Sequence, residues 1–308
     1  ISSSTISNGI HVDSVPPSRC YDVHMQTLRE AIESAREKGS ALGHFNISDS
    51  NQFNAVIAAA VAAKMPVVVG ASEGERAFFG VRALAALVAS ARASGVPVYL
   101  NADHTYSVEL VKEAIDAEFD AVIFDGSHLP LDENIAQTRE AVAYARACGR
   151  EVLVEGEIGR IGTSSKLLDK VPDDVDAALT TADEAARFVR ETGVDLLAPA
   201  VGTLHGRLKS GAMPRIDTKR IEEIREAAGV PLVLHGGSGS SEEDFVAAVK
   251  AGIALVHINT DIRVAYRKGI ESGIAKDADE IAPYRFLAPG VEGVKQVTER
   301  YIRLFALQ

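Results

Sequence analysis

Histidines lie at positions where they could bind a metal. His104, His205 and His235 lie in separate segments of the chain, each beside a small or acidic residue, and none lies inside the apolar part of a run. Three histidines from separate segments, with one coordination position left open, are typical of a catalytic Zn²⁺ site. A single histidine in such a place can equally well only form hydrogen bonds in a polar cleft. The prediction of zinc therefore depends on the three together.

A second group of residues could bind phosphate. The glycine-rich segment from His235 to Gly239 precedes a helical stretch, and Asn259-Thr260-Asp261 ends the next apolar run. Successive backbone N–H groups in such a loop, together with the Ser238 hydroxyl, form a site for an anion. A tight turn explains a glycine-rich loop equally well, so the prediction depends on where the fold places it.

These residues follow a repeated pattern of elements. Eight short apolar runs, rich in β-branched residues, each lead to a polar or glycine-containing end and then to a helical stretch. Runs that are apolar at consecutive positions are typical of parallel strands covered on both faces. The eight predicted strands are 41–47, 66–72, 97–103, 121–127, 151–157, 196–202, 231–237 and 253–259. The predicted helices between them are 52–63, 82–93, 107–117, 134–147, 182–191, 218–227 and 242–251.

The number and spacing of these units predict the fold. Eight βα units over roughly 260 residues match the size of a (β/α)8 or TIM barrel, which is about 250 residues. An amphipathic helix opens at Met25, and an extra C-terminal helix is expected over about 291–306. We therefore predict a single barrel domain over residues 25–308. Such barrels place the active site at the carboxyl ends of their strands, with phosphate at the loops after strands seven and eight.

The composition excludes several classes of function. Acidic residues outnumber basic ones by 43 to 32 and no run is rich in Lys or Arg, which argues against a nucleic-acid partner. No apolar stretch has membrane-spanning length. With only Cys20 and Cys148 and no secretory signal, a reduced, cytoplasmic compartment is expected.

The first 24 residues differ from the rest of the chain. They are rich in Ser and Pro and have no sustained hydrophobic period. The chain opens with Ile, and the periodic pattern opens with Met25. We expect residues 1–24 to be a leader that is either flexible or not part of the natural protein.

Six ordered segments resemble one enzyme family. The segments are LNADHTYS, VIFDGSH, VEGEIGRIG, AVGTLHGRLKSG, LVLHGGSG and INTDIRVAYRKG. Over about residues 26–305 the chain resembles the class II, metal-dependent ketose-bisphosphate aldolases, which include fructose- and tagatose-bisphosphate aldolases. The resemblance implies a zinc-dependent lyase, usually dimeric or tetrameric. It would cleave a phosphorylated ketose reversibly to dihydroxyacetone phosphate and an aldehyde through a metal-stabilised enediolate.

The resemblance also implies roles for individual residues. His104, His205 and His235 would bind Zn²⁺, and Asp125 and Glu157 would hold the metal in an alternative position. Asp103 would carry the proton of the substrate C4 hydroxyl, although it could instead only orient His104. The 1-phosphate, with which a monovalent cation can associate, would be held by Gly206, Gly236, Gly237, Ser238, Asn259 and Thr260. Lys209 would lie on the mobile loop after the metal ligand, and Arg263 would reach the distal phosphate.

Two positions depart from the family pattern. Ser165 stands where the family usually has a Glu that exchanges the C3 proton of dihydroxyacetone phosphate, and Asp169 is the nearest carboxylate. His257 stands where the family has an Asn that holds the enediolate. A histidine there could donate a similar hydrogen bond, carry a proton or add a metal ligand. We therefore predict aldol chemistry on a phosphorylated ketose, for which fructose 1,6-bisphosphate need not be the best substrate.

Other assignments remain open on the sequence alone. The protein could be a sugar-phosphate-binding or regulatory homologue that has lost turnover, or a metal-dependent barrel isomerase or epimerase. The segments 44–46 and 72–74 resemble pocket-lining positions of the family, but packing or loop capping explains them equally well. His128 is expected to be a solvent-exposed loop residue.

Overall fold

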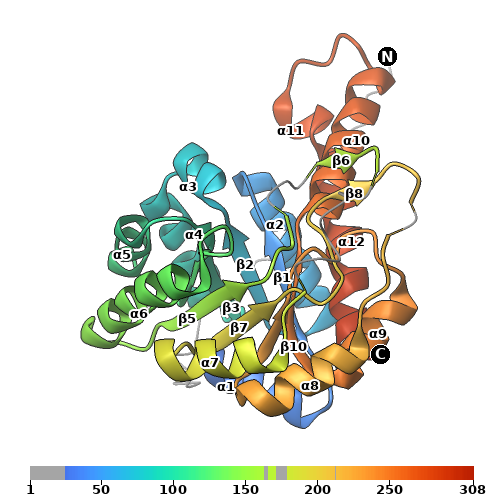
Figure 1. Cartoon of the computed structure of the whole chain (residues 1–308). Coiled ribbons are helices and arrows are strands. Elements are labelled where there is room, and N and C mark those ends of the chain that lie inside the picture. Colours follow the sequence, from blue (N-terminus) through green and yellow to red (C-terminus); the bar gives the residue numbers. More distant parts are fainter. Residues whose placement is uncertain (1–24, 163–165, 171–178, 212) are drawn as a thin grey trace, which may run out of the picture.

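Eight parallel strands close into a barrel (Figure 1). The computed structural model describes residues 25–162, 166–170, 179–211 and 213–308. The barrel strands are β1 (Leu42–Asn46), β2 (Val67–Ala71), β3 (Val98–Thr105), β4 (Ala121–Phe124), β5 (Leu153–Ile158), β7 (Leu196–Pro199), β9 (Leu232–Leu234) and β10 (Ile253–Ile258). Each falls on one of the predicted runs, and the closed order β1-β10-β9-β7-β5-β4-β3-β2 confirms the TIM barrel.

Helices surround the barrel. They are α2 (Ser50–Ala63), α3 (Glu73–Phe79), α4 (Val81–Ala93), α5 (Val108–Asp116), α6 (Leu131–Ala147), α7 (Ala182–Thr192), α8 (Thr218–Ala228), α9 (Glu242–Ala251) and α10 (Thr260–Lys276). All the helices predicted between strands are present, but α3 and α10 were not predicted. Few residues of α10 are buried, so its sequence shows no clear apolar stripe. Among the described residues, no helix has the length and apolar character needed to cross a membrane.

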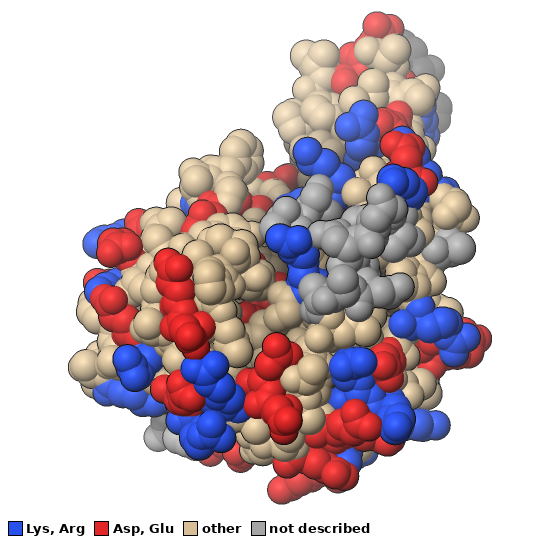
Figure 2. Space-filling view, viewed as in Figure 1, with Lys and Arg blue, Asp and Glu red and all other residues tan. Residues whose placement is uncertain are grey.

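The chain closes with the predicted extra helix. This helix, α12 (Ala288–Phe305), packs outside the barrel against α2 and α10. The far end of α10, the short α11 (Pro283–Phe286) and the start of α12 project from the barrel as an arm (Figure 1). Two short strands, β6 (Leu167–Leu168) and β8 (Arg207–Leu208), pair in a separate small sheet. On the face shown in Figure 2, acidic and basic side chains are interspersed.

The interior of the barrel changes from apolar to polar along its axis. At the amino-terminal end, α1 (Leu28–Glu37) packs against apolar strand residues, which include Leu42, Tyr99, Leu153, Val233 and Leu255. Side chains two residues apart on a strand point to the same side. Two positions further along the same five segments stand buried polar residues, namely His44, Asn101, Glu155, His235 and His257. The fold therefore provides an apolar floor and, directly above it, a layer of ionisable and amide groups.

Candidate active site

Asp103 and His104 are neighbours on β3, and both point into the mouth of the barrel. The pairing of β3 with β4 shifts register between Ala102 and Thr105, and His104 has a positive φ of 35°. Neighbouring residues on a regular strand point to opposite faces, whereas a bulge can turn both to one side. A non-glycine residue in this backbone region costs of order 1–3 kcal/mol, and such strain clusters at functional sites. The irregularity of β3 thus places two polar side chains at one point.

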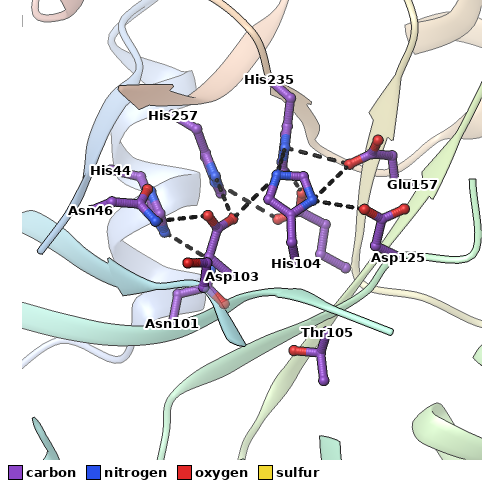
Figure 3. A network of polar contacts seen from close by, with 12 residues as sticks. His44, Asn46, Asn101, Asp103, His104, Thr105, Asp125, Glu157, His235 and His257 are labelled. Carbon is purple, nitrogen blue, oxygen red and sulfur yellow. Dashed lines mark hydrogen bonds and ion pairs between the residues drawn. The ribbon is translucent and has the colours of Figure 1, made fainter. Parts of the chain in front are cut away.

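Four donors converge beside this bulge. His104, Glu157, His205 and His235 each offer a ligand atom, and these atoms lie within 4.8 Å of one another. His104 Nε2 and His235 Nδ1 are 3.2 Å apart, close to the separation of about 3.3 Å that two nitrogens have on one tetrahedral Zn²⁺. Figure 3 shows His104, His235 and Glu157 turned toward one another.

The unpaired atoms of this group fit a metal ion. His205 Nε2 and both carboxylate oxygens of Glu157 are buried and have no hydrogen-bond partner. Buried polar atoms without partners are rare because their desolvation is not compensated. A divalent cation would give each of them a ligand bond. The donor set of three histidines and a carboxylate therefore fits the divalent metal that the sequence resemblance implies.

Two more buried carboxylates border the donors. Asp125 Oδ2 lies 2.8 Å from His104 Nδ1, and Glu155 Oε1 lies 2.7 Å from His235 Nε2. Burial, and then the charge of neighbouring carboxylates, raise the pKa of Glu155 and Glu157 well above the ordinary value. Burial opposes ionisation of Asp125 too, but the hydrogen bond and charge of His104 and the hydrogen bonds from Ser127 together outweigh it and lower the pKa of Asp125. A bound cation would relieve this crowding of negative charge.

His257 lies between two other imidazole rings. Its ring centroid is 3.5 Å from that of His44 and 4.2 Å from that of His235. His257 Nδ1 lies 3.3 Å from Asp103 Oδ1. Burial keeps the pKa of His257 well below its ordinary value and lowers that of His44 to about 4, so both rings are neutral near pH 7. His257 does not belong to the group of four convergent donors, but its donor atoms also converge with those of His44 and Asp103 and with those of Glu155 and His235.

The position of His44 depends on a glycine of the next strand. A Cβ atom at Gly70 would lie 2.0 Å from the His44 ring, so only glycine leaves room for the imidazole. His44 Nε2 lies 3.2 Å from Asn101 Nδ2 and accepts its hydrogen bond. From the sequence, no role was predicted for Glu155 or Asn101. His44 was only noted as similar to a pocket-lining residue of the family. Each of the three lies two residues before a polar residue of the same strand: Glu157, Asp103 and Asn46, respectively. Because side chains two residues apart point to the same side, this spacing could have indicated that they face the site.

One small cavity brings the predicted phosphate residues together. Asn259 precedes Thr260, the first residue of α10. Both residues line the same cavity as the glycine-rich loop, so the amino end of this helix lies beside that loop. A Cβ atom on Gly236 would lie 2.7 Å from the Leu204 backbone, which explains why a glycine is needed where the two loops meet. Asn46, Asp103, His104, His205 and His257 complete the cavity. Its other lining residues are Gly206, Gly236, Gly237, Ser238, Asn259 and Thr260.

A second cavity of about 190 Å³ adjoins the first. His104, His205 and Asn259 line both. The other residues lining the second cavity are Ser72, Glu73, Gly74, Tyr106, Gly162 and Arg263. Arg263 Nη2 lies 2.6 Å from Glu75 Oε1. We call the first cavity proximal and the second distal.

Comparison with known proteins identifies the family. Residues 26–308 match the family described as "Fructose-bisphosphate aldolase class-II". The chain belongs to the class II aldolase family. It is 35% identical over 285 residues to the 6-phospho-5-dehydro-2-deoxy-D-gluconate aldolase of Bacillus licheniformis, covering 91% of this chain and 94% of that protein. It is 34% identical over 284 residues to the fructose-bisphosphate aldolase of Staphylococcus aureus, covering 91% and 96%.

A solved structure of the family has the same fold. The YdjI aldolase of Escherichia coli K12 superposes with a TM-score of 0.74 at 28% identity, covering 91% of this chain and 96% of that one. The resemblance found in the sequence is thus confirmed, and the chain is an aldolase-family lyase. The roles of its individual residues remain predictions.

The structure gathers most, but not all, of the predicted site residues of this class II aldolase. Lys209 lines neither cavity, and its ammonium group lies 2.8 Å from Asp169 on the surface. The position of Ser165 lies outside the described residues, as does the predicted leader. His128 is exposed, as expected. Lys209 was predicted from its position in a family motif. A motif position does not show that Asp169 lies close enough to pair with the ammonium group.

Proposed function

We propose that the protein is a zinc-dependent aldolase that cleaves a ketose phosphate reversibly to dihydroxyacetone phosphate and an aldehyde. The observation that carries the proposal is the convergence of four donors, His104, Glu157, His205 and His235, at a cavity that Asp103, His104 and His205 line. The names of the two curated relatives, both aldolases, support it.

The metal would be held by this chain's own side chains. His104, His205 and His235 are the proposed ligands, with Glu157 and Asp125 able to hold the ion in an alternative position. When bound, the metal supplies a Lewis acid for the negative charge that develops on the substrate oxygens, typically worth several kcal/mol. No lysine that forms a Schiff base is then needed.

Asp103 is the proposed acid/base. Its Oδ2 atom accepts a hydrogen bond of 2.8 Å from Asn46 Nδ2, and Oδ1 faces His257. Burial opposes ionisation, but the charge of His104 and the hydrogen bond of His257 hold the pKa of Asp103 well below its ordinary value. An ionised Asp103 can accept the C4 hydroxyl proton in cleavage and return it in condensation. Such proton transfer typically contributes about 10²–10⁴-fold to the rate.

His257 replaces the asparagine of the family. It lines the proximal cavity next to Asp103 but stands outside the four-donor group. We therefore assign it a hydrogen bond or a proton transfer at the substrate, not a ligand bond to the metal. The loop and helix residues Gly206, Gly236, Gly237, Ser238, Asn259 and Thr260 would hold the 1-phosphate, with a monovalent cation beside it.

The remaining assignments concern the whole molecule. We propose one barrel domain over 25–308 with a leader at 1–24, a cytoplasmic location, and no nucleic-acid or membrane partner. We also propose a homodimer or homotetramer. On the projecting arm, Ile274, Ile281 and Tyr284 are 51%, 88% and 75% exposed, and such apolar side chains favour burial against another subunit.

The test is an assay of the purified, zinc-loaded protein with ketose monophosphates and bisphosphates. The proposal expects cleavage of at least one. It also expects exchange of the C3 proton of dihydroxyacetone phosphate in heavy water. A protein that only binds sugar phosphates would show affinity without exchange, and an isomerase or epimerase would exchange the proton without breaking a carbon–carbon bond. No cleavage of any substrate at full zinc occupancy would overturn the proposal.

A further inference from the structure

Among the described residues that line the distal cavity, Arg263 is the one Lys or Arg. Its guanidinium group is already paired with a carboxylate. Arg263 Nη2 lies 2.6 Å from Glu75 Oε1, and the two side chains are 39% and 6% exposed. Glu75 is fixed from the other side, because its Oε2 atom accepts hydrogen bonds from Asn46 Nδ2 at 2.9 Å and from the Ser72 backbone at 2.8 Å. The carboxylate is thus held against Arg263 by the start of α3.

The other described residues that line the distal cavity bring a negative charge and no further Lys or Arg. Glu73 lines the same cavity and accepts a hydrogen bond of 2.7 Å from the Tyr106 backbone. Arg76, next to Glu75, directs its guanidinium to the carbonyls of Ala71 and Asp103 and to the hydroxyl of Thr105. The internal segments that the structure leaves undescribed, 163–165, 171–178 and 212, contain no Lys or Arg.

Two basic side chains on and just after β8 are paired in the same way. Arg207 Nη1 lies 2.9 Å from Asp261, and Lys209 Nζ lies 2.8 Å from Asp169. The proximal cavity needs no such cation, since backbone N–H groups at a helix start and a glycine-rich loop bind phosphate. The distal cavity, in contrast, is lined by one carboxylate, Glu73, and by one arginine that is already paired with a second carboxylate, Glu75.

We propose that Glu75 is a specificity-determining residue, and that the protein acts on ketose 1-phosphates in preference to ketose 1,6-bisphosphates. A distal phosphate would meet Glu73 and would have to compete with Glu75 for Arg263. The hydroxyl groups of an unphosphorylated end can donate to the carboxylates and accept from Arg263. Unfavourable charge against one substrate is a common source of selectivity.

The reaction follows from the proposed function, on which this inference rests. The C3–C4 bond of the ketose 1-phosphate breaks, and its electron pair stays on C3 of the dihydroxyacetone phosphate half, which then takes up a proton from water. Asp103 receives the C4 hydroxyl proton, and the other half leaves as an unphosphorylated aldehyde. For fructose 1-phosphate that aldehyde is glyceraldehyde.

The test compares kcat/KM for fructose 1-phosphate and fructose 1,6-bisphosphate, and in a second pair for the corresponding tagatose phosphates. The zinc-loaded wild-type protein should favour the monophosphate by at least about tenfold. This ratio needs no variant, so it stands whether or not a substitution folds. A preference for the bisphosphates in both pairs would overturn the inference.

The variant Glu75→Gln sharpens the test. The amide oxygen of the glutamine can still accept the hydrogen bonds from Asn46 and Ser72. Its neutral NH₂ group faces Arg263 in place of the carboxylate oxygen, so the ion pair is lost. We expect the ratio to move toward the bisphosphate by about tenfold. If the variant instead lost bisphosphate activity selectively, Glu75 would be orienting Arg263 for a phosphate, and the inference would be wrong.

Asp195→Asn is the matched control. Asp195 is also 6% exposed in its side chain and pairs with Arg29, which is 40% exposed, at the opposite end of the barrel. The ratio of kcat/KM for the monophosphate to kcat/KM for the bisphosphate should be the same in Asp195→Asn as in the wild type. Exchange of the C3 proton of dihydroxyacetone phosphate involves only the proximal half and should persist in both variants. Loss of exchange in the wild type would overturn the proposed function, whereas exchange with a wild-type preference for bisphosphates would overturn only the inference.

Discussion

The two ends of the barrel interior use the same strands for opposite purposes. At the amino-terminal end, Leu42, Tyr99, Leu153 and Leu255 pack under α1 as a continuous apolar core. Two residues further along each strand, His44, Asn101, Glu155 and His257 are equally buried, but they carry charge, lone pairs or N–H groups. The apolar layer gains free energy from burial, whereas the polar layer loses hydration that its own contacts do not fully restore.

The unpaired atoms show where the cost lies. His44 Nδ1, Asn101 Oδ1, Glu155 Oε2 and His257 Nε2 are all buried without a hydrogen-bond partner. Such a layer would be a poor choice for stability alone. We infer that the apolar end stabilises the barrel and that the polar end is kept for binding and chemistry. Substitutions in the two layers should therefore separate stability from activity.

The largest effect is expected from the metal group. His205→Ala removes one proposed ligand and should lower kcat/KM by about 10³-fold or more, because several kcal/mol of charge stabilisation would be lost. Bound zinc, measured by elemental analysis, should fall in parallel. The free energy of unfolding of the metal-free protein should change little. Full activity with full zinc occupancy would remove His205 from the proposed ligand set.

Asp103→Asn should have the next largest effect. The amide keeps the size of the side chain but cannot accept the C4 hydroxyl proton, so kcat should fall about 10²–10⁴-fold. Zinc content should stay at the wild-type level. If zinc were lost instead, Asp103 would act by orienting His104, which is the alternative that the sequence left open.

The comparison also explains what the sequence could and could not predict. The barrel and the convergence of His104, His205 and His235 were predictable, because consecutive apolar residues mark the strands and the histidines follow their ends. Glu155 and His44 were missed as site residues because a strand buried on both faces has no alternation to show which side chains point inward. The pair of Glu75 and Arg263 joins residues 188 positions apart, and only closure of the barrel between β1 and β10 brings their elements together.

Leu153→Ala tests the apolar layer. Leu153 is 1% exposed and lies two residues before Glu155 on β5. Truncating a buried leucine to alanine typically costs about 2–5 kcal/mol through lost burial and the cavity left behind. Urea unfolding should show this loss, while kcat of the folded fraction and zinc content stay near the wild-type values. A large fall in kcat with intact stability would contradict the division of roles between the layers.

The smallest effect should come from acid. The pKa of His44 is about 4 in the folded protein, chiefly because of burial, against an ordinary value of 6.5. Since the unfolded chain takes up the proton first, His44 contributes stability above pH 6.5 that is lost as the pH falls toward 4, about 2 kcal/mol by pH 5. In the metal-free protein, His44→Gln should therefore make the free energy of unfolding less dependent on pH between 7 and 5. The control is His128→Gln, which removes an exposed histidine that lies outside the polar layer. Equal pH dependence in His44→Gln and the wild type would show that burial of the His44 ring does not lower the free energy of unfolding in acid.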